Sequence, residues 1–219
     1  MPIVDCDCTT TTLPATGAAR CGENFGQMQI LAFEKKSDAQ SGLSVLTAIK
    51  TKSNWTDGMT AAKVQLTPEI KGWEQSGGDA VNWGEDVDPL GMPMKVRDNP
   101  VQITVTFRGT KEAVMNKIEE MRCLAQMKDL GMYIFPTTNK VLGVDNTTTL
   151  DSFSVDYISV NPRVIGVRDV PDASSVVMYI PADEWRKMKA VELLGTGEGT
   201  TPDTTTPWRG IDLLPVTIS

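Results

Sequence analysis

Residues 99–127 read NPVQITVTFRGTKEAVMNKIEEMRCLAQM. In the first part of this stretch, apolar and polar residues alternate. One face would carry Val101, Ile103, Val105 and Phe107, and the other Gln102, Thr104, Thr106 and Arg108. A period of two is typical of a half-buried antiparallel strand, because successive side chains point to opposite faces of a sheet. The pattern therefore predicts a strand over Pro100–Gly109.

The second part of the stretch predicts an amphipathic helix. Thr110 is a suitable cap, Glu112 falls in the first turn, and Gly131 stands where a left-handed terminator belongs. The apolar residues then recur at the helical period and form one stripe. The residues on this stripe are Val114, Ile118, Met121 and Ala125, with Leu124 beside it. We expect the stripe to pack on the apolar face of the preceding strand.

Alternation recurs on both sides of this stretch. Residues 4–8 and 153–157 alternate in the same way. A second, short helix is expected to begin at Pro181, with Asp183 and Glu184 near its start. Trp185 and Met188 would form its apolar side. Further strand candidates are Gln27–Phe33, Leu43–Lys50, Ala62–Thr67, Met132–Phe135, Lys140–Val144, Arg163–Val167 and Ser175–Ile180.

These elements predict a mainly β (α+β) fold. We expect an antiparallel β-sandwich with one flanking amphipathic helix, a short second helix and extended terminal arms. Length favours one large domain or two small ones, and we expect a single β-sandwich domain over residues 1–219. Within it, residues 1–26 would form an N-terminal arm, residues 72–99 a long Gly- and Pro-rich loop, and residues 195–219 a C-terminal arm.

Composition excludes several classes of function. The chain has no histidine, which removes Ser-His-Asp and Cys-His catalysis and His-ligated metals. Its formal net charge is −7, with 21 Lys and Arg against 28 Asp and Glu, and this disfavours a binder of nucleic acid or of anionic membranes. We therefore expect neither an enzyme nor a sequence-specific nucleic-acid binder.

The cysteines and the apolar runs point to a protein made soluble in a reducing cytoplasm. The N-terminus has no basic and apolar segments of the kind found in signal peptides, and the longest apolar runs, such as Val176–Ile180, are far too short to span a bilayer. We expect Cys6, Cys8, Cys21 and Cys123 to be free thiols, because a chain of this length needs no disulfide staples. The spacing fits a four-cysteine zinc site poorly, so no metal or other cofactor is expected.

An acidic cluster and the tryptophans are the candidate functional residues. Asp79, Glu85, Asp86 and Asp88 lie within ten residues free of Lys and Arg. This cluster could be a solvated loop, a calcium site or a surface that faces a partner or a lumen. The tryptophans fall mostly in irregular segments, where they could anchor contacts between subunits or fold back and be buried. The interface candidates are Trp73, Trp83 and Trp208, together with the apolar tail residues Ile211, Leu213 and Leu214, which could add a strand to a neighbour.

The order of the elements resembles that of phage tail tube proteins. The strand and helix of residues 99–127 are followed by the short strand patterns GMYIFP, KVLGV and FSVDYISV, and the resemblance extends over Gln27–Ile180. It implies a β-sandwich with a flanking helix and a virion homo-oligomer of stacked hexameric rings. It also implies a negatively lined lumen that conducts the genome and contacts with other virion proteins.

Two other interpretations remain open at this stage. A capsid decoration protein or a head–tail connector could use the same sandwich and the same arms. A carbohydrate-binding β-sandwich module, from a different class, would use exposed tryptophan faces as sugar platforms.

Overall fold

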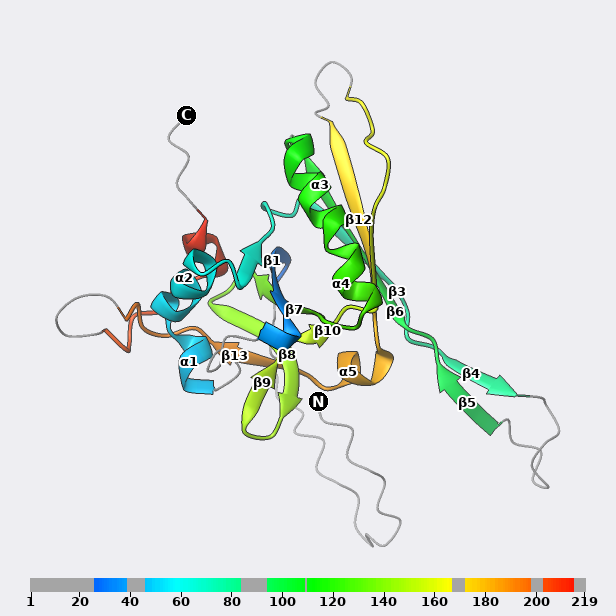
Figure 1. Ribbon diagram of the computed structural model, residues 1–219. Coiled ribbons are helices and arrows are strands. Elements are labelled where there is room, and N and C mark those ends of the chain that lie inside the picture. Colours follow the sequence, from blue (N-terminus) through cyan, green and yellow to red (C-terminus); the bar gives the residue numbers. More distant parts are fainter. Residues whose placement is uncertain are drawn as a thin grey trace, which may run out of the picture.

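The computed structural model describes residues 26–38, 46–83, 94–108, 110–166, 172–197 and 203–214. The fold is mainly β, with two antiparallel sheets and a separate two-stranded ribbon (Figure 1). Sheet A has the order β13 (Met188–Glu192), β8 (Lys140–Asn146), β7 (Leu130–Pro136), β1 (Met28–Lys35) and β2 (Val64–Leu66), while β9 (Thr149–Asp151) pairs with β8 and β10 (Phe153–Ser154) with β7. Sheet B has the order β11 (Tyr157–Val160), β12 (Ala173–Ile180), β6 (Val101–Arg108) and β3 (Gly72–Gly77).

Sheet A is covered on both faces, and its central strand β7 is accordingly apolar throughout. All seven residues of β7 are buried. Leu31, Phe33, Met132 and Ile134 face sheet B and share a core cluster with it. On the other face, Ile30, Ala32, Tyr133 and Phe135 pack under α1 (Leu46–Lys50), α2 (Lys52–Thr60) and the short 3-10 helix η2 (Gly210–Leu213).

The outer core of sheet A is built around Trp55 of α2. Its fully buried ring meets the rings of Tyr133 and Phe135 edge-on, at centroid distances of 5.3 and 4.9 Å. Its indole Nε1 donates a hydrogen bond to the carbonyl of Ile49 at 2.8 Å, which joins α2 to α1. A buried aromatic side chain whose polar atom is satisfied stabilises the fold strongly.

The predicted strand and helix of residues 99–127 are confirmed. Strand β6 buries Val101, Ile103, Val105 and Phe107 in the core cluster that also holds Met115, Ile118 and Ala125 of the helical segment. The helix is divided at Met121 into α3 (Glu112–Glu120) and α4 (Arg122–Gln126). Val114, Met121 and Leu124 are only partly buried against this cluster.

The ends of this helical segment differ from the prediction. Lys111, not Thr110, is the N-cap residue, and Lys128 takes the left-handed conformation (φ 56°) after the last turn. Gly131, the predicted terminator, lies in β7 instead. A Cβ atom at this position would lie 2.2 Å from Ser152 Oγ, so the glycine allows close approach between neighbouring strands.

Most other strand predictions are confirmed, and the exceptions have clear causes. Residues 43–50 were expected to form a strand, but Leu46–Lys50 is helix α1; a short apolar run does not distinguish a strand from a buried helix. The strand expected over 153–157 is divided, because the chain passes from sheet A to sheet B between β10 and β11. In the region of Arg163–Val167, Val164 forms an isolated bridge with Ala173, and residue 167 lies outside the described residues, as do residues 4–8.

The second short helix forms as predicted. Helix α5 (Ala182–Arg186) begins after Pro181, and Trp185 packs against Phe153 at a centroid distance of 5.4 Å. Met188 is not on this helix; it is the first residue of β13.

The expected long loop over residues 72–99 contains three strands. Besides β3, it holds β4 (Ala80–Trp83) and β5 (Met94–Asp98), which pair with each other. Figure 1 shows that this β4–β5 hairpin continues the β3–β6 pair and projects from the body of the molecule. The bend falls at Gly77 and Gly78, whose φ values of 79° and 81° favour glycine.

Within the described residues, no helix is long and apolar enough to cross a membrane.

The position of Ile118 gives a direct test of the helix packing. Ile118→Ala should lower the free energy of unfolding by ~2–5 kcal/mol, because the side chain is 4% exposed and lies in the same core cluster as Val105 and Phe107. Urea titration measures this loss. The exposed neighbour Lys117 is the control, and Lys117→Ala should change stability by no more than about 0.5 kcal/mol. Equal effects for the two variants would contradict the packing.

Candidate interaction surfaces

The tryptophan candidates occupy different environments. Trp73 lies on the edge strand β3 and is 40% exposed. Trp208 is 4% exposed; its Nε1 donates a hydrogen bond to the carbonyl of Lys50 at 2.7 Å, and its ring lies 6.3 Å from that of Phe135. Trp83 lies on β4. Of the rings of Trp73 and Trp208, that of Trp73 is the one exposed to a partner.

The segment expected to form a C-terminal arm packs on its own chain over residues 203–214. The N–H of Gly195 donates to the carbonyl of Thr206 at 2.8 Å, and Leu194 bridges Pro207. Leu213 is buried in the outer core of sheet A, and Ile211 and Leu214 are partly buried against it. The expectation of a free arm is therefore wrong for these residues, while residues 215–219 lie outside the described residues.

One local feature shapes the start of this segment, and another docks it on the body. The Asp203 carboxylate accepts hydrogen bonds from the N–H groups of Thr205 and Thr206, at 2.8 and 3.1 Å. Hydrogen bonding to the Thr206 side chain and to these N–H groups lowers the pKa of Asp203 to about 2. Gly210 then lies directly on Phe135, where a Cβ atom would come within 2.4 Å of the Phe135 Cβ. Composition alone, rich in Thr and Pro, gave no sign of this docking.

The acidic candidates are only partly described. Asp79 is exposed between β3 and β4, and its carbonyl accepts a hydrogen bond from the N–H of Asn99 at 2.9 Å. Glu85, Asp86 and Asp88 lie outside the described residues. Among the residues that are described, no group of three or more Cys, Asp or Glu side chains is placed to hold a metal ion. Cys123 is an exposed free thiol, and Cys6, Cys8 and Cys21 are again outside the described ranges.

A second acidic region, not anticipated from the sequence, lies at the base of the hairpin. Asp98, Asp156 and Asp183 line a pocket of about 350 Å³ there. Asp98 forms an ion pair with Arg186, which raises the pKa of the guanidinium, and Arg186 Nη2 also donates to the carbonyl of Gly78 at 3.1 Å. Arg186 thereby joins α5 to both strands at the root of the hairpin. These three aspartates are far apart in the sequence, so no local pattern could reveal them.

An apolar pocket of about 250 Å³ opens between the two sheets at the same end of the molecule as α5. Sheet B contributes Trp73 and Gln75 of β3, and α5 contributes Trp185. The remaining lining residues are Gly26, Met28, Ile134, Pro136, Leu142 and Met188. We call this pocket the tryptophan socket.

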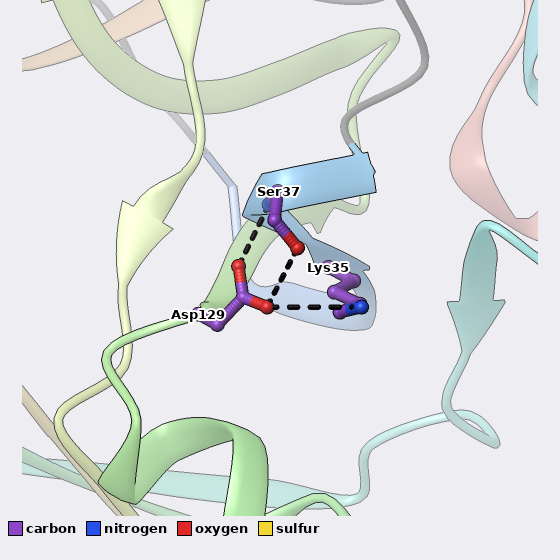
Figure 2. Close-up of polar contacts among 3 residues, drawn as sticks. All are labelled: Lys35, Ser37 and Asp129. Atoms are coloured by element: carbon purple, nitrogen blue, oxygen red, sulfur yellow. Dashed lines mark hydrogen bonds and ion pairs between the residues drawn. The ribbon is translucent and has the colours of Figure 1, made fainter.

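Where β1 ends beside the start of β7, polar residues join the two segments (Figure 2). Asp129 accepts hydrogen bonds from the N–H and the hydroxyl of Ser37, at 2.7 and 2.8 Å, and lies 4.0 Å from Lys35 Nζ. The Ser37 hydrogen bonds lower the pKa of Asp129. These contacts fix η1 (Lys36–Asp38) against the loop before β7, which is a structural role.

Glu34 is a buried carboxyl in β1. It is 6% exposed, and burial raises its pKa, although a hydrogen bond with Ser152 and the nearby Lys36 act in the opposite direction. Its backbone pairs with Gly131 in β7, beside the close approach of Ser152. Glu34 thus lies at a point where sheet A tolerates little change in volume.

The different burial of Trp208 and Trp73 can be tested with two matched variants. Trp208→Ala should lower the free energy of unfolding by ~3–5 kcal/mol, as expected for a buried aromatic ring. Trp73→Ala should cost less than about 1 kcal/mol, because its ring is substantially exposed. Chemical denaturation of both variants checks the ranking, and the reverse order would contradict the docking of residues 203–214.

The buried carboxyl of Glu34 predicts a pH dependence of stability. Because the folded state raises its pKa above the ordinary value of 4.5, Glu34 contributes most stability below that value and loses this contribution as pH rises through the folded-state pKa. Glu34→Gln keeps the side chain neutral at every pH. The free energy of unfolding of this variant, relative to that of the wild type, should therefore be higher at about pH 8 than at about pH 4. Denaturation at both pH values measures the difference. A difference independent of pH would contradict the burial of this carboxyl.

Comparisons with known proteins returned no significant match. No family model matches the sequence, and neither a curated protein nor a solved structure resembles the chain closely enough to count as a relative. The functional argument therefore depends on the fold and surfaces of this chain.

Proposed function

We propose that the protein is a non-catalytic structural subunit of a phage particle, and specifically a tail tube subunit that forms stacked hexameric rings. The mainly β body with two antiparallel sheets and a helix beside β6 supports this proposal. The order of strand, helix and short strands is the order on which the resemblance to tail tube proteins was based.

The observation that carries the proposal is the projecting β4–β5 hairpin. Its two strands pair only with each other among the described residues, and they leave the body where β3 and β6 end (Figure 1). A two-stranded hairpin alone is marginally stable in water, so a projecting one gains stability by packing on another molecule. Arg186 and the Gly77–Gly78 bend set its direction at the base. Such an extension is suited to reaching a neighbouring subunit.

The charge of the chain fits the same role. A net charge of −7 per subunit, repeated around a ring, gives the assembly a strongly negative field. A lumen with this field repels the phosphate backbone, so DNA passes without adhering to the wall. Exposed carboxylates of the described residues, such as Glu74 and Asp79, are available for such a surface.

The alternatives predict different behaviour. A capsid decoration protein or connector would assemble on other virion proteins, without forming tubes by itself. A carbohydrate-binding module would bind sugar as a monomer through exposed aromatic rings. That alternative is weakened by the burial of Trp55 and Trp208, which leaves Trp73 as the most exposed tryptophan ring of the described residues.

The hairpin provides the test of assembly. Replacing residues 80–98 by a two-residue Asn-Gly turn should be compatible with the fold, because the Asn99 N–H and the Asp79 carbonyl already lie 2.9 Å apart. Negative-stain microscopy of the concentrated wild type should show rings or tubes. The shortened chain should need at least about tenfold higher concentration to assemble, equivalent to ~1.4 kcal/mol of lost contact energy.

The control is Thr147→Gly, which relieves a positive φ in the exposed turn between β8 and β9 and should assemble like the wild type. Circular dichroism verifies that both variants are folded. A wild type that stays monomeric at high concentration and binds a glycan array would overturn the structural role. Tubes formed equally well without the hairpin would remove the observation on which the proposal depends.

A further inference from the structure

Two adjacent apolar side chains are strongly exposed on the connection between β11 and β12. Val164 is 65% exposed and Ile165 is 83% exposed. Isolated exposed apolar residues are common, but two neighbours at such exposure on a fixed backbone are a candidate contact site. We call this pair the knob.

The backbone of the knob is held in place from both sides. Val164 and Ala173 exchange two backbone hydrogen bonds, of 2.8 and 3.0 Å. Asp172 forms an ion pair with Arg163 at 2.7 Å and accepts a hydrogen bond from the N–H of Gly166, also at 2.7 Å. Because these contacts order the backbone in advance, burial of the knob by a partner would cost little conformational entropy.

The tryptophan socket has the size and chemistry to receive such a knob. Its volume of about 250 Å³ is below the range of roughly 300–1,000 Å³ that is usual for small-molecule sites. It suits one or two aliphatic side chains better than a drug-sized ligand. Its walls, formed by Trp73, Trp185 and Met188 among others, are mainly apolar.

The knob and the socket are separate surfaces of the molecule. Trp73 pairs with Val105, and Val105 pairs with Val176, so this wall of the socket lies two strands away from the middle of β12. Val164 is bridged to Ala173, the first residue of β12, while α5 with Trp185 follows the last residue of that strand. Eight residues of extended chain span roughly 25 Å. Figure 1 shows the β11–β12 connection and α5 at the two ends of β12. A chain therefore cannot fill its own socket with its own knob, but a second copy can.

Both ends carry charges of both signs, with Asp172 and Glu112 near the knob and Arg186 and Lys187 near α5, but exposed basic side chains lie beside the knob and carboxylates beside the socket. Arg108 pairs in register with Ala173 at the knob end, and Lys111 follows Thr110, whose carbonyl accepts a hydrogen bond from Arg163. At the socket end, Asp156 and Asp183 line the acidic pocket beside α5. In a head-to-tail contact, the basic side chains of one copy would face the carboxylates of the next, which favours this orientation over the reverse.

We propose that Val164 and Ile165 of one copy insert into the tryptophan socket of a second copy. The contact joins two different surfaces of the same chain, so a pair of copies keeps one free knob and one free socket. Such a heterologous contact repeats from copy to copy, and it gives a closed ring if the rotation between copies closes or an open filament if it does not. The inference rests on the proposed function, since it names the partner and the direction of stacking for a self-assembling subunit.

Complementary variants test the contact. Ile165→Asp destroys the knob and leaves the socket intact, whereas Trp73→Ser damages the socket and leaves the knob intact. Sedimentation velocity over a concentration series should show end-to-end association weakened about tenfold or more in each variant alone, as expected when a buried aliphatic or aromatic contact is lost. An equimolar mixture of the two should recover one contact per pair, because each variant supplies the half that the other lacks.

The control is Met127→Asp, at a side chain that is 70% exposed at the end of α4 and belongs to neither surface. It should associate like the wild type. If the wild type assembles and Ile165→Asp assembles equally well, or the mixture recovers nothing, the knob-and-socket contact is wrong while the structural role stands. If the wild type does not self-associate at all, both the knob-and-socket contact and the proposed structural role are wrong.

Discussion

The pairing of β1 with β7 is the constraint on which the rest of the structure depends. The two strands run antiparallel over seven register pairs at the centre of sheet A, and both faces of the pair are covered. One face supports sheet B and the α3–α4 segment; the other supports Trp55, Trp208 and the two short helices α1 and α2. Each large apolar side chain buried there contributes roughly 1.5–3 kcal/mol. Without this double-sided layer, neither the inner core nor the docked segment 203–214 would have a surface to pack on.

The candidate interaction surfaces are formed by the parts of the chain that lie outside this core. Sheet B buries one face against sheet A and extends its β3–β6 pair into the β4–β5 hairpin, which lies beyond the core. At the end of the sandwich near α5, the two sheets separate enough to leave the tryptophan socket; at the other end, the β11–β12 connection presents Val164 and Ile165. A body with an apolar pocket, an exposed apolar pair and a projecting hairpin offers surfaces for contacts with other molecules. This is the physical basis of the proposed role as an assembling subunit.

Much of the sheet structure could be predicted from the sequence, because a strand with one face in the core and the other toward solvent shows a regular alternation of apolar and polar residues. The alternation in Val101–Arg108 predicted β6 and its buried face, and the spacing around Ile118 predicted the helix that covers it. The hairpin was missed because Gly, Asp and Asn dominate residues 72–99, and their pairing depends on a partner strand that local patterns do not show. Gly131 was misread as a helix terminator because close approach to Ser152 and a left-handed turn both require glycine. Trp208 was assigned to an interface because its pocket is formed by residues more than 70 positions away, such as Phe135 and Lys50.

Hydrogen–deuterium exchange at low and high protein concentration tests the central claim most directly, because it separates core from assembly contacts in one experiment. The amides of β7 should be protected at both concentrations, since they belong to the core of the single chain. Those of β4, β5 and Ile165 should exchange faster in the dilute protein than in the concentrated one, because the proposed contacts cover them only on assembly. Exchange at the hairpin and at Ile165 that is unchanged by concentration would contradict a self-assembling structural subunit.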